Sequence, residues 1–278
     1  MAVPTFDLTG RKAVVTGGST GLGYAMAYAL AQSGAKVMIS GRRESLLKEA
    51  ADQLSTALGS RDAISWCAAD LYDRKSVDEF AAHAIKAFNG VDIFVGNAGA
   101  VHAEHVAQIT LENIDAALQL NLVTNITLTQ AFLPHMRKQK WGRILFSSST
   151  ASHLYAPHQG NIIYSATKSG LNGFARSIAG DLGREGITVN NLIIGVHWTS
   201  ILRGIVADMR KGGMGDQADE LVNGFVRMTA VGRLGEVEDL HGIVQLLASD
   251  AGAYITGASI PMDGGTSIMM TPYPDAPA

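Results

Sequence analysis

Residues 16–23 read Thr16-Gly17-Gly18-Ser19-Thr20-Gly21-Leu22-Gly23, between a short apolar run at 13–16 and an amphipathic stretch at 24–33. Glycine adopts the positive φ of a tight turn and lets backbone N–H groups approach a ligand closely. A helix that begins directly after such a turn adds partial positive charge at its N-terminus. This strand-turn-helix context favours a pyrophosphate-binding turn, and a tight turn without a ligand is the alternative that the stretch alone leaves open.

The same alternation of a short β-branched run and a longer amphipathic stretch continues along the chain. It predicts strands at 13–16, 36–40, 63–67, 93–96, 143–147, 188–194 and 259–262, and helices at 24–33, 43–58, 75–88, 111–136, 164–184 and 237–249. Strands that alternate with crossover helices indicate a doubly wound parallel α/β sheet. We therefore predict one domain over residues 1–278, with helices on both faces of the sheet.

Two segments do not follow this alternation of strands and helices. Residues 196–231 form a long connection that carries a glycine-rich cluster at 211–215, and we expect this connection to be a lid over a site. The tail, residues 266–278, holds three prolines and two adjacent methionines, and we expect it to be extended rather than helical.

Composition narrows the class of partner. A formal net charge of −3 provides no basic field for nucleic acid or an anionic membrane surface, which favours a small-molecule partner. The eight histidines form no zinc-spaced cluster with cysteine or carboxylate residues, so no metal is expected. No apolar run approaches the ~20 residues of a membrane helix. A single cysteine, Cys67, and an N-terminus without a secretory pattern indicate a cytoplasmic location.

The second predicted strand leads into Ser40-Gly41-Arg42-Arg43, where a dinucleotide fold contacts the adenosine ribose. A carboxylate here accepts hydrogen bonds from a free ribose 2′-hydroxyl, and none is present. Arg42, and with it Arg43, offers charge-assisted hydrogen bonds to a 2′-phosphate instead. The pattern favours NADP(H) over NAD(H), the alternative being two solvated arginines at the start of a helix.

A phenol and an ammonium group lie four residues apart in Tyr164-Ser165-Ala166-Thr167-Lys168, and therefore on one face of the predicted helix. Reduction of a carbonyl needs a proton donor, and the reverse oxidation needs the corresponding base. A tyrosine with a pKa near ~10 becomes an effective base only when nearby positive charge stabilises its phenolate. Ser149, after the strand at 143–147, can hold the substrate oxygen, with Ser147 and Ser148 as alternatives.

These motifs, TGGSTGLG, NAG, SSS, YSATK and the late MDGG, resemble those of the short-chain dehydrogenase/reductase family, in order and spacing, over residues 6–266. The resemblance implies that Tyr164 is the general acid/base and that Lys168 lowers its pKa and holds the nicotinamide ribose. It implies further that Ser149 orients the substrate oxygen and that Asn121 holds a proton-relay water.

The resemblance also implies cofactor contacts, and it implies a homotetramer or a homodimer. The cofactor-binding residues would be Gly17, Ser19, Thr20, Gly21, Leu22, Gly23, Arg42, Arg43, Asp70, Leu71, Asn97, Ala98, Gly99, Tyr164, Lys168, Gly195, Val196 and Thr199. The sequence departs from the family pattern at Ile194, where proline is usual, and at Gly96, where a second asparagine is frequent.

The expected activity is hydride transfer between NADP(H) and a carbonyl or alcohol carbon of a small, ring-bearing or apolar substrate. Residues expected to line the substrate pocket are His102, His153 and Trp198. Two alternatives remain open. One is a non-catalytic NADP(H)-binding sensor on the same fold, and the other is a sugar, polyol or 3-oxoacyl dehydrogenase.

Overall fold

The carboxyl ends of parallel strands gather at one edge of a central sheet. In the computed structural model, which describes residues 5–101, 103–154 and 160–273, seven strands form one parallel sheet in the order β3-β2-β1-β4-β5-β6-β7. They are β1 (Lys12–Thr16), β2 (Lys36–Gly41), β3 (Ile64–Ala68), β4 (Ile93–Gly96), β5 (Gly142–Ser149), β6 (Ile187–Ile194) and β7 (Ser259–Met262). The strand order reverses between β1 and β4, and open α/β sheets bind ligands at such a reversal.

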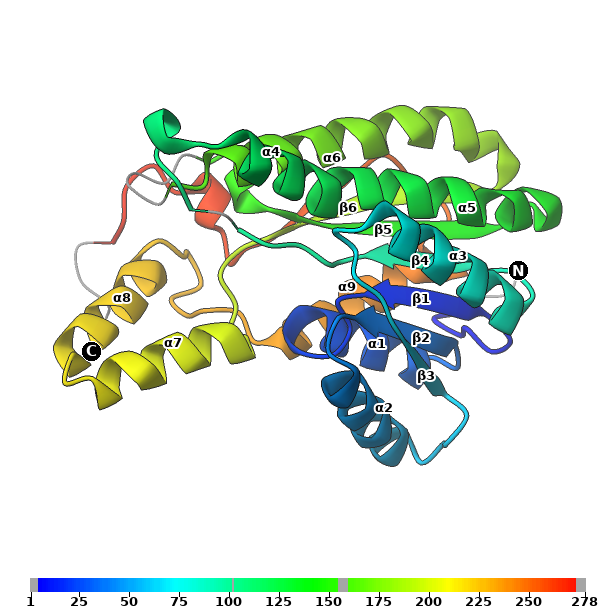
Figure 1. Cartoon of the computed structure of the whole chain (residues 1–278), viewed down its shortest axis with the longest axis horizontal. Coiled ribbons are helices and arrows are strands. Elements are labelled where there is room, and N and C mark those ends of the chain that lie inside the picture. The colour runs from blue at the N-terminus through cyan, green and yellow to red at the C-terminus, as the bar shows by residue number, and fades with distance from the viewer. Residues whose placement is uncertain (1–4, 102, 155–159, 274–278) are drawn as a thin grey trace.

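Helices cover both faces of this sheet (Figure 1). They are α1 (Gly21–Gln32), α2 (Glu44–Leu58), α3 (Arg74–Phe88), α4 (Leu111–Leu118), α5 (Thr124–Gln139), α6 (Ile162–Leu182), α7 (Ser200–Lys211), α8 (Gly215–Arg227) and α9 (His241–Ala248). One core cluster lies under α1, α2 and α9, and a second lies under α3, α5 and α6. Strands buried on both faces read as continuous apolar runs, which is why β1 and β4 were visible in the sequence. The predicted doubly wound single domain is confirmed.

The helix predicted at 111–136 is wrong as one continuous element. A π-helical turn at Gln119–Val123 separates α4 from α5. The side chain of Asn125 supports this turn by donating a hydrogen bond to the Asn121 carbonyl oxygen at 2.9 Å. A turn of this kind inserts one residue and redirects the side chains that follow it, and it places Asn121 against the neighbouring helix α6.

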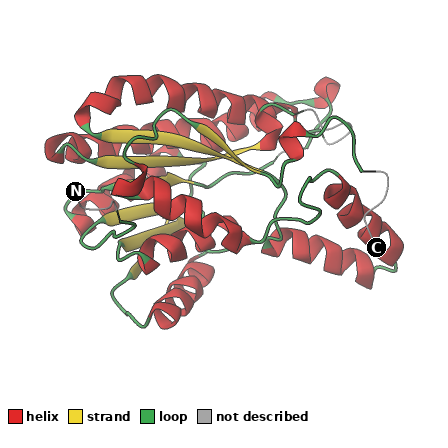
Figure 2. Cartoon of the chain, turned by 180° about the vertical axis from the view of Figure 1, so that it is seen from behind, coloured by secondary structure: helices red, strands yellow, loops and turns green. Residues whose placement is uncertain are grey.

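The long connection at 196–231 folds into α7 and α8, which lie apart from the sheet beyond the carboxyl ends of its strands (Figures 1 and 2). The glycine-rich cluster forms the turn between them, where Gly213 has a φ of +76°. The prediction of an extended tail is wrong at its start, because residues Thr266–Ile268 form a 3-10 turn. Residues 274–278 lie outside the described part of the chain.

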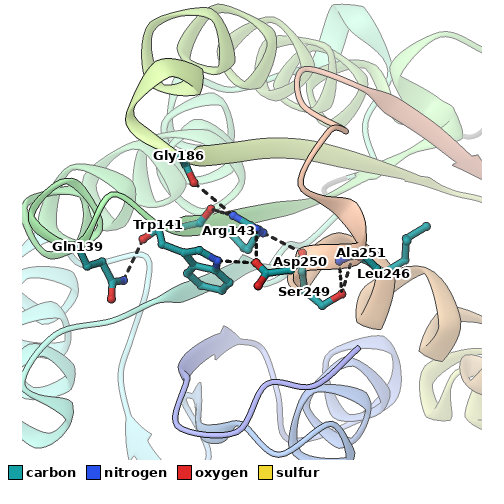
Figure 3. A network of polar contacts seen from close by, with 9 residues as sticks. Gln139, Trp141, Arg143, Gly186, Leu246, Ser249, Asp250 and Ala251 are labelled. Carbon is teal, nitrogen blue, oxygen red and sulfur yellow. Dashed lines mark hydrogen bonds and ion pairs between the residues drawn. The ribbon is translucent and has the colours of Figure 1, made fainter. Parts of the chain in front are cut away.

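Arg143, at the start of β5, is 2% exposed. It therefore lies at the amino end of its strand, away from the carboxyl ends that face α7 and α8, and Figure 3 shows its contacts. Its guanidinium donates to the carbonyl oxygens of Ser249 at 3.1 Å and Gly186 at 3.3 Å, and pairs with Asp250 at 3.0 Å. The same group lies 4.2 Å from the centroid of the Trp141 ring. Burial lowers the pKa of Arg143 to about 10, and the Asp250 charge opposes that shift. One side chain thus joins β5, β6 and the end of α9.

Candidate active site

The turn after β1 has several positions that only glycine can occupy. Gly17 and Gly21 have φ values of +66° and +59°, which belong to the left-handed region. A Cβ atom at Gly23 would collide with the carbonyl oxygen of Gly17. Helix α1 begins at Gly21, so its unpaired backbone N–H groups open onto this turn. The turn can accommodate a dianionic group, as the sequence predicts.

Two polar side chains join the ends of β1 and β4. The Oγ1 atom of Thr16 accepts hydrogen bonds from the backbone N–H groups of Asn97 and Ala98, both at 3.0 Å. The Nδ2 atom of Asn97 donates to the carbonyl oxygens of Thr16 at 3.0 Å and Gly17 at 3.3 Å. These hydrogen bonds hold the glycine turn against the loop at Asn97 and Ala98, at the point where the strand order reverses.

A cavity of about 360 Å³ opens above this turn. Most of the predicted cofactor residues line it, namely Gly17, Ser19, Thr20, Gly21, Leu22, Gly23, Arg42, Arg43, Leu71, Asn97, Ala98, Gly99 and Thr199. Arg42 and Arg43 bring two guanidinium groups to it, and that of Arg42 lies 5.4 Å from the centroid of the Tyr72 ring. A glycine turn, a helix N-terminus and two cations suit a dinucleotide with an additional phosphate.

Five predicted cofactor residues do not line this cavity: Asp70, Gly195, Val196, and Tyr164 and Lys168, whose positions are described below. Asp70 is exposed and does not line the 360 Å³ cavity; its carboxylate accepts a hydrogen bond from the Tyr72 backbone N–H at 3.1 Å. Gly195 and Val196 line a second, larger cavity of about 730 Å³. A Cβ atom at Gly195 would come within 2.7 Å of the Asp263 backbone. This position therefore needs glycine, because the segment after β6 passes very close to the segment after β7.

Ser149 and Tyr164 meet in the 730 Å³ cavity. Their side chains hydrogen-bond to each other, and this bond lowers the pKa of Tyr164 while burial, the larger effect, raises it. The two alternative serines point elsewhere. The hydroxyl of Ser147 donates to Oδ1 of Asn97 at 3.0 Å, and that of Ser148 is buried without a hydrogen-bond partner. The structure thus brings Ser149, rather than its neighbours, to the phenol.

Lys168 lies beneath this pair and is 3% exposed. Its Nζ atom donates to the Ser147 carbonyl oxygen at 2.6 Å and lies 5.5 Å from the centroid of the Tyr164 ring. Burial lowers the pKa of Lys168 to about 8, because desolvation disfavours the charged ammonium. A hydroxyl donor, a partly buried phenol and a nearby ammonium can deliver a proton to a carbonyl oxygen and remove it again.

Asn121 is fully buried in the π-helical turn. Its Oδ1 atom accepts from the Ala100 backbone N–H, and its Nδ2 atom donates to the Ala100 carbonyl oxygen, both at 3.0 Å. Nδ2 also lies 3.3 Å from Oγ1 of Thr167, the neighbour of Lys168 on α6. The amide thus joins the loop after β4 to the helix that carries Tyr164 and Lys168.

Sequence reasoning missed Thr167 and Tyr72. Thr167 lies inside the YSATK motif, and its position beside Lys168 was the available signal. Of the residues expected in the substrate pocket, His153 lines the larger cavity. Trp198 is absent from the described lining and instead lies 5.2 Å from the Arg203 guanidinium, and His102 lies outside the described residues.

The two departures from the family pattern have local explanations. A Cβ atom at Gly96 would collide with the Asn125 side chain, so the space usually given to an asparagine on the strand is filled from α5. Ile194 is 5% exposed and pairs with Met262 across β6 and β7. Its side chain packs in the core cluster under α1 and α9. Neither residue is among the hydrogen-bond partners given above for Asn121, Ser149 or Lys168.

No helix in the described part of the chain is both long and apolar enough to cross a bilayer. Within the same residues, no three histidine, cysteine or acidic side chains gather as a group able to hold a metal ion.

Comparisons with known proteins agree with this geometry. The short chain dehydrogenase family model matches residues 11–210. An L-rhamnose 1-dehydrogenase (NADP(+)) of Thermoplasma acidophilum is 35% identical over 263 residues, which cover 94% of this chain and 98% of the relative. A 3-oxoacyl-[acyl-carrier-protein] reductase of Synechocystis is 32% identical and covers 93% of this chain and 97% of its own length. The structure of L-sorbose reductase from Gluconobacter frateurii with NADPH and L-sorbose superposes with a TM-score of 0.88, at 26% identity, over 95% of this chain and 99% of that one.

The chain belongs to the short-chain dehydrogenase family. It is an NADP(H)-dependent oxidoreductase that acts on alcohol and carbonyl groups.

Proposed function

We propose that this enzyme reduces an uncharged ketone with an apolar or ring-bearing body and oxidises the corresponding secondary alcohol. NADP(H), when bound, supplies or accepts the hydride. Tyr164 donates its proton to the carbonyl oxygen during reduction and takes it back during oxidation. Ser149 holds that oxygen beside the phenol, and Lys168 stabilises the phenolate with its positive charge.

Binding roles follow from the smaller cavity. The turn at 17–23 and the N-terminus of α1 hold the pyrophosphate, and Arg42 and Arg43 hold the 2′-phosphate. The remaining predicted cofactor residues, Asp70 among them, belong to this proposal. Asn121 acts by positioning, because its amide holds the loop at Ala100 against α6. The proton-relay water implied by family resemblance stays a prediction.

The observation that carries the substrate class is that histidines, His105 and His153, are the only basic side chains among the residues that the structure describes around the larger cavity. No lysine, arginine, aspartate or glutamate is among its described lining residues. Aliphatic and aromatic side chains form much of its wall, including Val101, Leu154, Ile162, Val196, Phe225 and Met228. A buried carboxylate without a cation or a set of donors is costly, so this cavity disfavours anionic substrates.

Three of the hydroxyl groups that line the cavity strengthen this point. Ser169, Thr229 and Thr266 donate their single protons to backbone carbonyl oxygens at 2.7, 2.9 and 2.8 Å. A hydroxyl that has donated its proton still accepts hydrogen bonds. These groups can therefore accept from a neutral alcohol, but they offer no donor to a carboxylate.

A neutral sugar is the second candidate, and the same acceptor oxygens favour it. Two of the similar proteins are named for L-rhamnose and L-sorbose, which are uncharged polyols. The non-catalytic sensor is the third reading, and it differs from both in predicting cofactor binding without turnover.

The test is a matched pair of substrates. We expect kcat/KM with NADPH to be at least about tenfold higher for cyclohexanone than for 3-oxocyclohexane-1-carboxylate, which differs by one ionised group. L-rhamnose with NADP⁺ tests the sugar candidate in parallel. A preference for the carboxylate contradicts the proposed substrate class, and tight NADPH binding without turnover of any of the three favours the sensor.

Three further predictions belong to this proposal. Residues 196–231 act as a lid, because Phe225 and Met228 line the larger cavity while Thr199 lines the smaller one. Light scattering of the purified protein tests the predicted homotetramer. Cell fractionation tests the cytoplasmic location.

A further inference from the structure

The carboxylate of Asp263 shapes the chain that follows β7. Asp263 is 8% exposed, and its two oxygens accept hydrogen bonds from the backbone N–H groups of Gly265 at 2.9 Å and Ser267 at 2.8 Å. The hydroxyl of Ser267 also hydrogen-bonds to this carboxylate. The 3-10 turn at Thr266–Ile268 is thereby folded back toward the larger cavity, which Thr266 lines.

This turn is bonded to a residue on another wall of the same cavity. The Nε2 atom of His153 lies 3.1 Å from Oγ of Ser267, and its Nδ1 atom lies 3.0 Å from Oγ of Ser152. Ser152 in turn accepts a hydrogen bond from Nδ2 of Asn172 on α6 at 3.0 Å. A continuous chain of side chains runs from Asp263 to α6.

The groups at the two ends of this chain of side chains, the Asp263 carboxylate and the Asn172 amide, indicate where each proton lies. An ionised carboxylate only accepts, so the Ser267 proton points to Asp263, and its oxygen accepts from His153 Nε2–H. An amide NH₂ group only donates, so the Ser152 hydroxyl keeps its own proton to give, and His153 Nδ1 is the acceptor within hydrogen-bond distance of it among the described contacts. This arrangement places the His153 ring proton on Nε2 and makes Nδ1 the acceptor.

Both ring nitrogens of His153 are thus bonded to the protein. Only the carbon atoms and the faces of the ring remain for contact with a ligand in the cavity. The imidazole thus presents its carbon atoms and ring faces to the cavity, beside Leu154.

The same turn also holds the wall at the end of α8. The carbonyl oxygen of Gly264 accepts hydrogen bonds from the backbone N–H groups of Ala230 at 2.8 Å and Val231 at 3.1 Å. Those residues directly follow Met228 and Thr229, which line the cavity. Residues 263–267 therefore connect the His153 wall to the α8 wall.

We propose that Asp263 and Ser267 are positioning residues that fix His153 as its Nε2–H tautomer, with the carbon atoms and faces of its ring as a wall, and so set the shape of the substrate cavity for an uncharged ring. This inference rests on the proposed function for the substrate class, but the state of His153 does not depend on turnover.

The first arm of the test needs no substrate. A two-bond ¹H–¹⁵N spectrum of the histidine side chains, with the His153 signal assigned by its loss in His153→Gln, reports the tautomer at pH 8. We expect a single Nε2–H tautomer in the native protein and a mixture in Ser267→Ala. Ser259→Ala, a serine-to-alanine change on β7, is the control and keeps the native pattern. A native His153 that is a mixture, or protonated on Nδ1, overturns the proposal even if Ser267→Ala does not fold.

The second arm measures kinetics with cyclohexanone. Loss of one hydrogen bond that positions the wall is expected to raise KM about fivefold in Ser267→Ala, while kcat and NADPH affinity stay within about twofold. Ser267→Thr, which keeps the hydroxyl, restores KM. An unchanged KM in Ser267→Ala, or a loss confined to kcat, contradicts the positioning role. If the native enzyme does not turn over any ketone, the proposed function fails and the tautomer alone decides the inference.

Discussion

The Nζ atom of Lys168 lies 5.5 Å from the centroid of the Tyr164 ring. Lys168 is buried and Tyr164 is partly buried, and burial acts on them in opposite directions, raising the pKa of the phenol and lowering that of the ammonium to about 8. In each case desolvation disfavours the charged form, and the charged forms are the ones that stabilise each other. Catalysis by this pair therefore depends on whether the lysine keeps its proton.

The reduction is expected to lose rate as the pH rises through about 8, the pKa of Lys168. Below that pH the ammonium is charged and stabilises the phenolate that forms when Tyr164 gives up its proton; above it, that charge is lost. The measurement is kcat/KM for NADPH against pH, which reports groups of the free enzyme. In Lys168→Arg the descending limb moves to higher pH, because guanidinium stays protonated. If kcat/KM falls at the same pH in the native enzyme and in Lys168→Arg, Lys168 is not the group whose titration causes the fall.

Gly99 is expected to be intolerant of a single methyl group. A Cβ atom there would lie 3.1 Å from Oδ1 of Asn121 and 3.3 Å from Nζ of Lys168, so both must shift by a few tenths of an ångström. Small displacements of catalytic groups are costly, and Gly99→Ala should lower kcat/KM roughly tenfold. Gly173→Ala on α6, where a Cβ meets nothing within 4 Å, is the matched control. Equal activities in the two variants would show that the Gly99 contact is unimportant.

Arg42 is expected to discriminate between the two nicotinamide cofactors. If its guanidinium holds the 2′-phosphate, Arg42→Ala loses a charge-assisted hydrogen bond and raises the NADPH dissociation constant about tenfold. NADH lacks that phosphate, so its binding should not change. Titration of both cofactors by fluorescence is the measurement, and Lys48→Ala, an exposed lysine on α2, controls for the general loss of positive charge. An equal weakening of both cofactors would place Arg42 away from the 2′-phosphate.

Arg143 is expected to contribute to stability rather than to catalysis. Arg143→Met keeps much of the side-chain volume but leaves the Ser249 carbonyl oxygen without its donor and removes one of the two donors to the Gly186 carbonyl oxygen (Figure 3). Unsatisfied buried groups cost about 1–3 kcal/mol each, so the free energy of unfolding should fall by about 2 kcal/mol or more. Arg137→Met removes an exposed ion pair with Glu185 and should cost less than about 1 kcal/mol. Urea unfolding compares them, and equal losses would contradict the role given to the buried hydrogen bonds.

The strands and the glycine turn were predictable because their signals are local. Buried parallel strands are apolar throughout, and the turn at 17–23 needs glycine for its positive φ and its close contacts. Tyr164 and Lys168 were equally visible, since a spacing of four places both on one face of α6.

The features that sequence reasoning missed depend on long-range packing. The π-helical turn that carries Asn121 is supported by Asn125 and by the loop at Ala100, and no helical period reveals it. The link between Ser267 and His153 joins residues 114 positions apart. Contacts of this kind follow from the folded topology rather than from the pattern around either residue.

The most direct test of the account is NADPH-dependent reduction by Tyr164→Phe, which removes one hydroxyl and keeps the ring. With the best neutral ketone, we expect kcat to fall at least about 100-fold, the usual contribution of a positioned general acid, with NADPH affinity unchanged. Tyr254→Phe, which changes a fully exposed tyrosine, should keep native activity. If Tyr164→Phe instead retains turnover within about tenfold of the native enzyme, the proton comes from another group and the assignment of Tyr164 as the general acid is wrong.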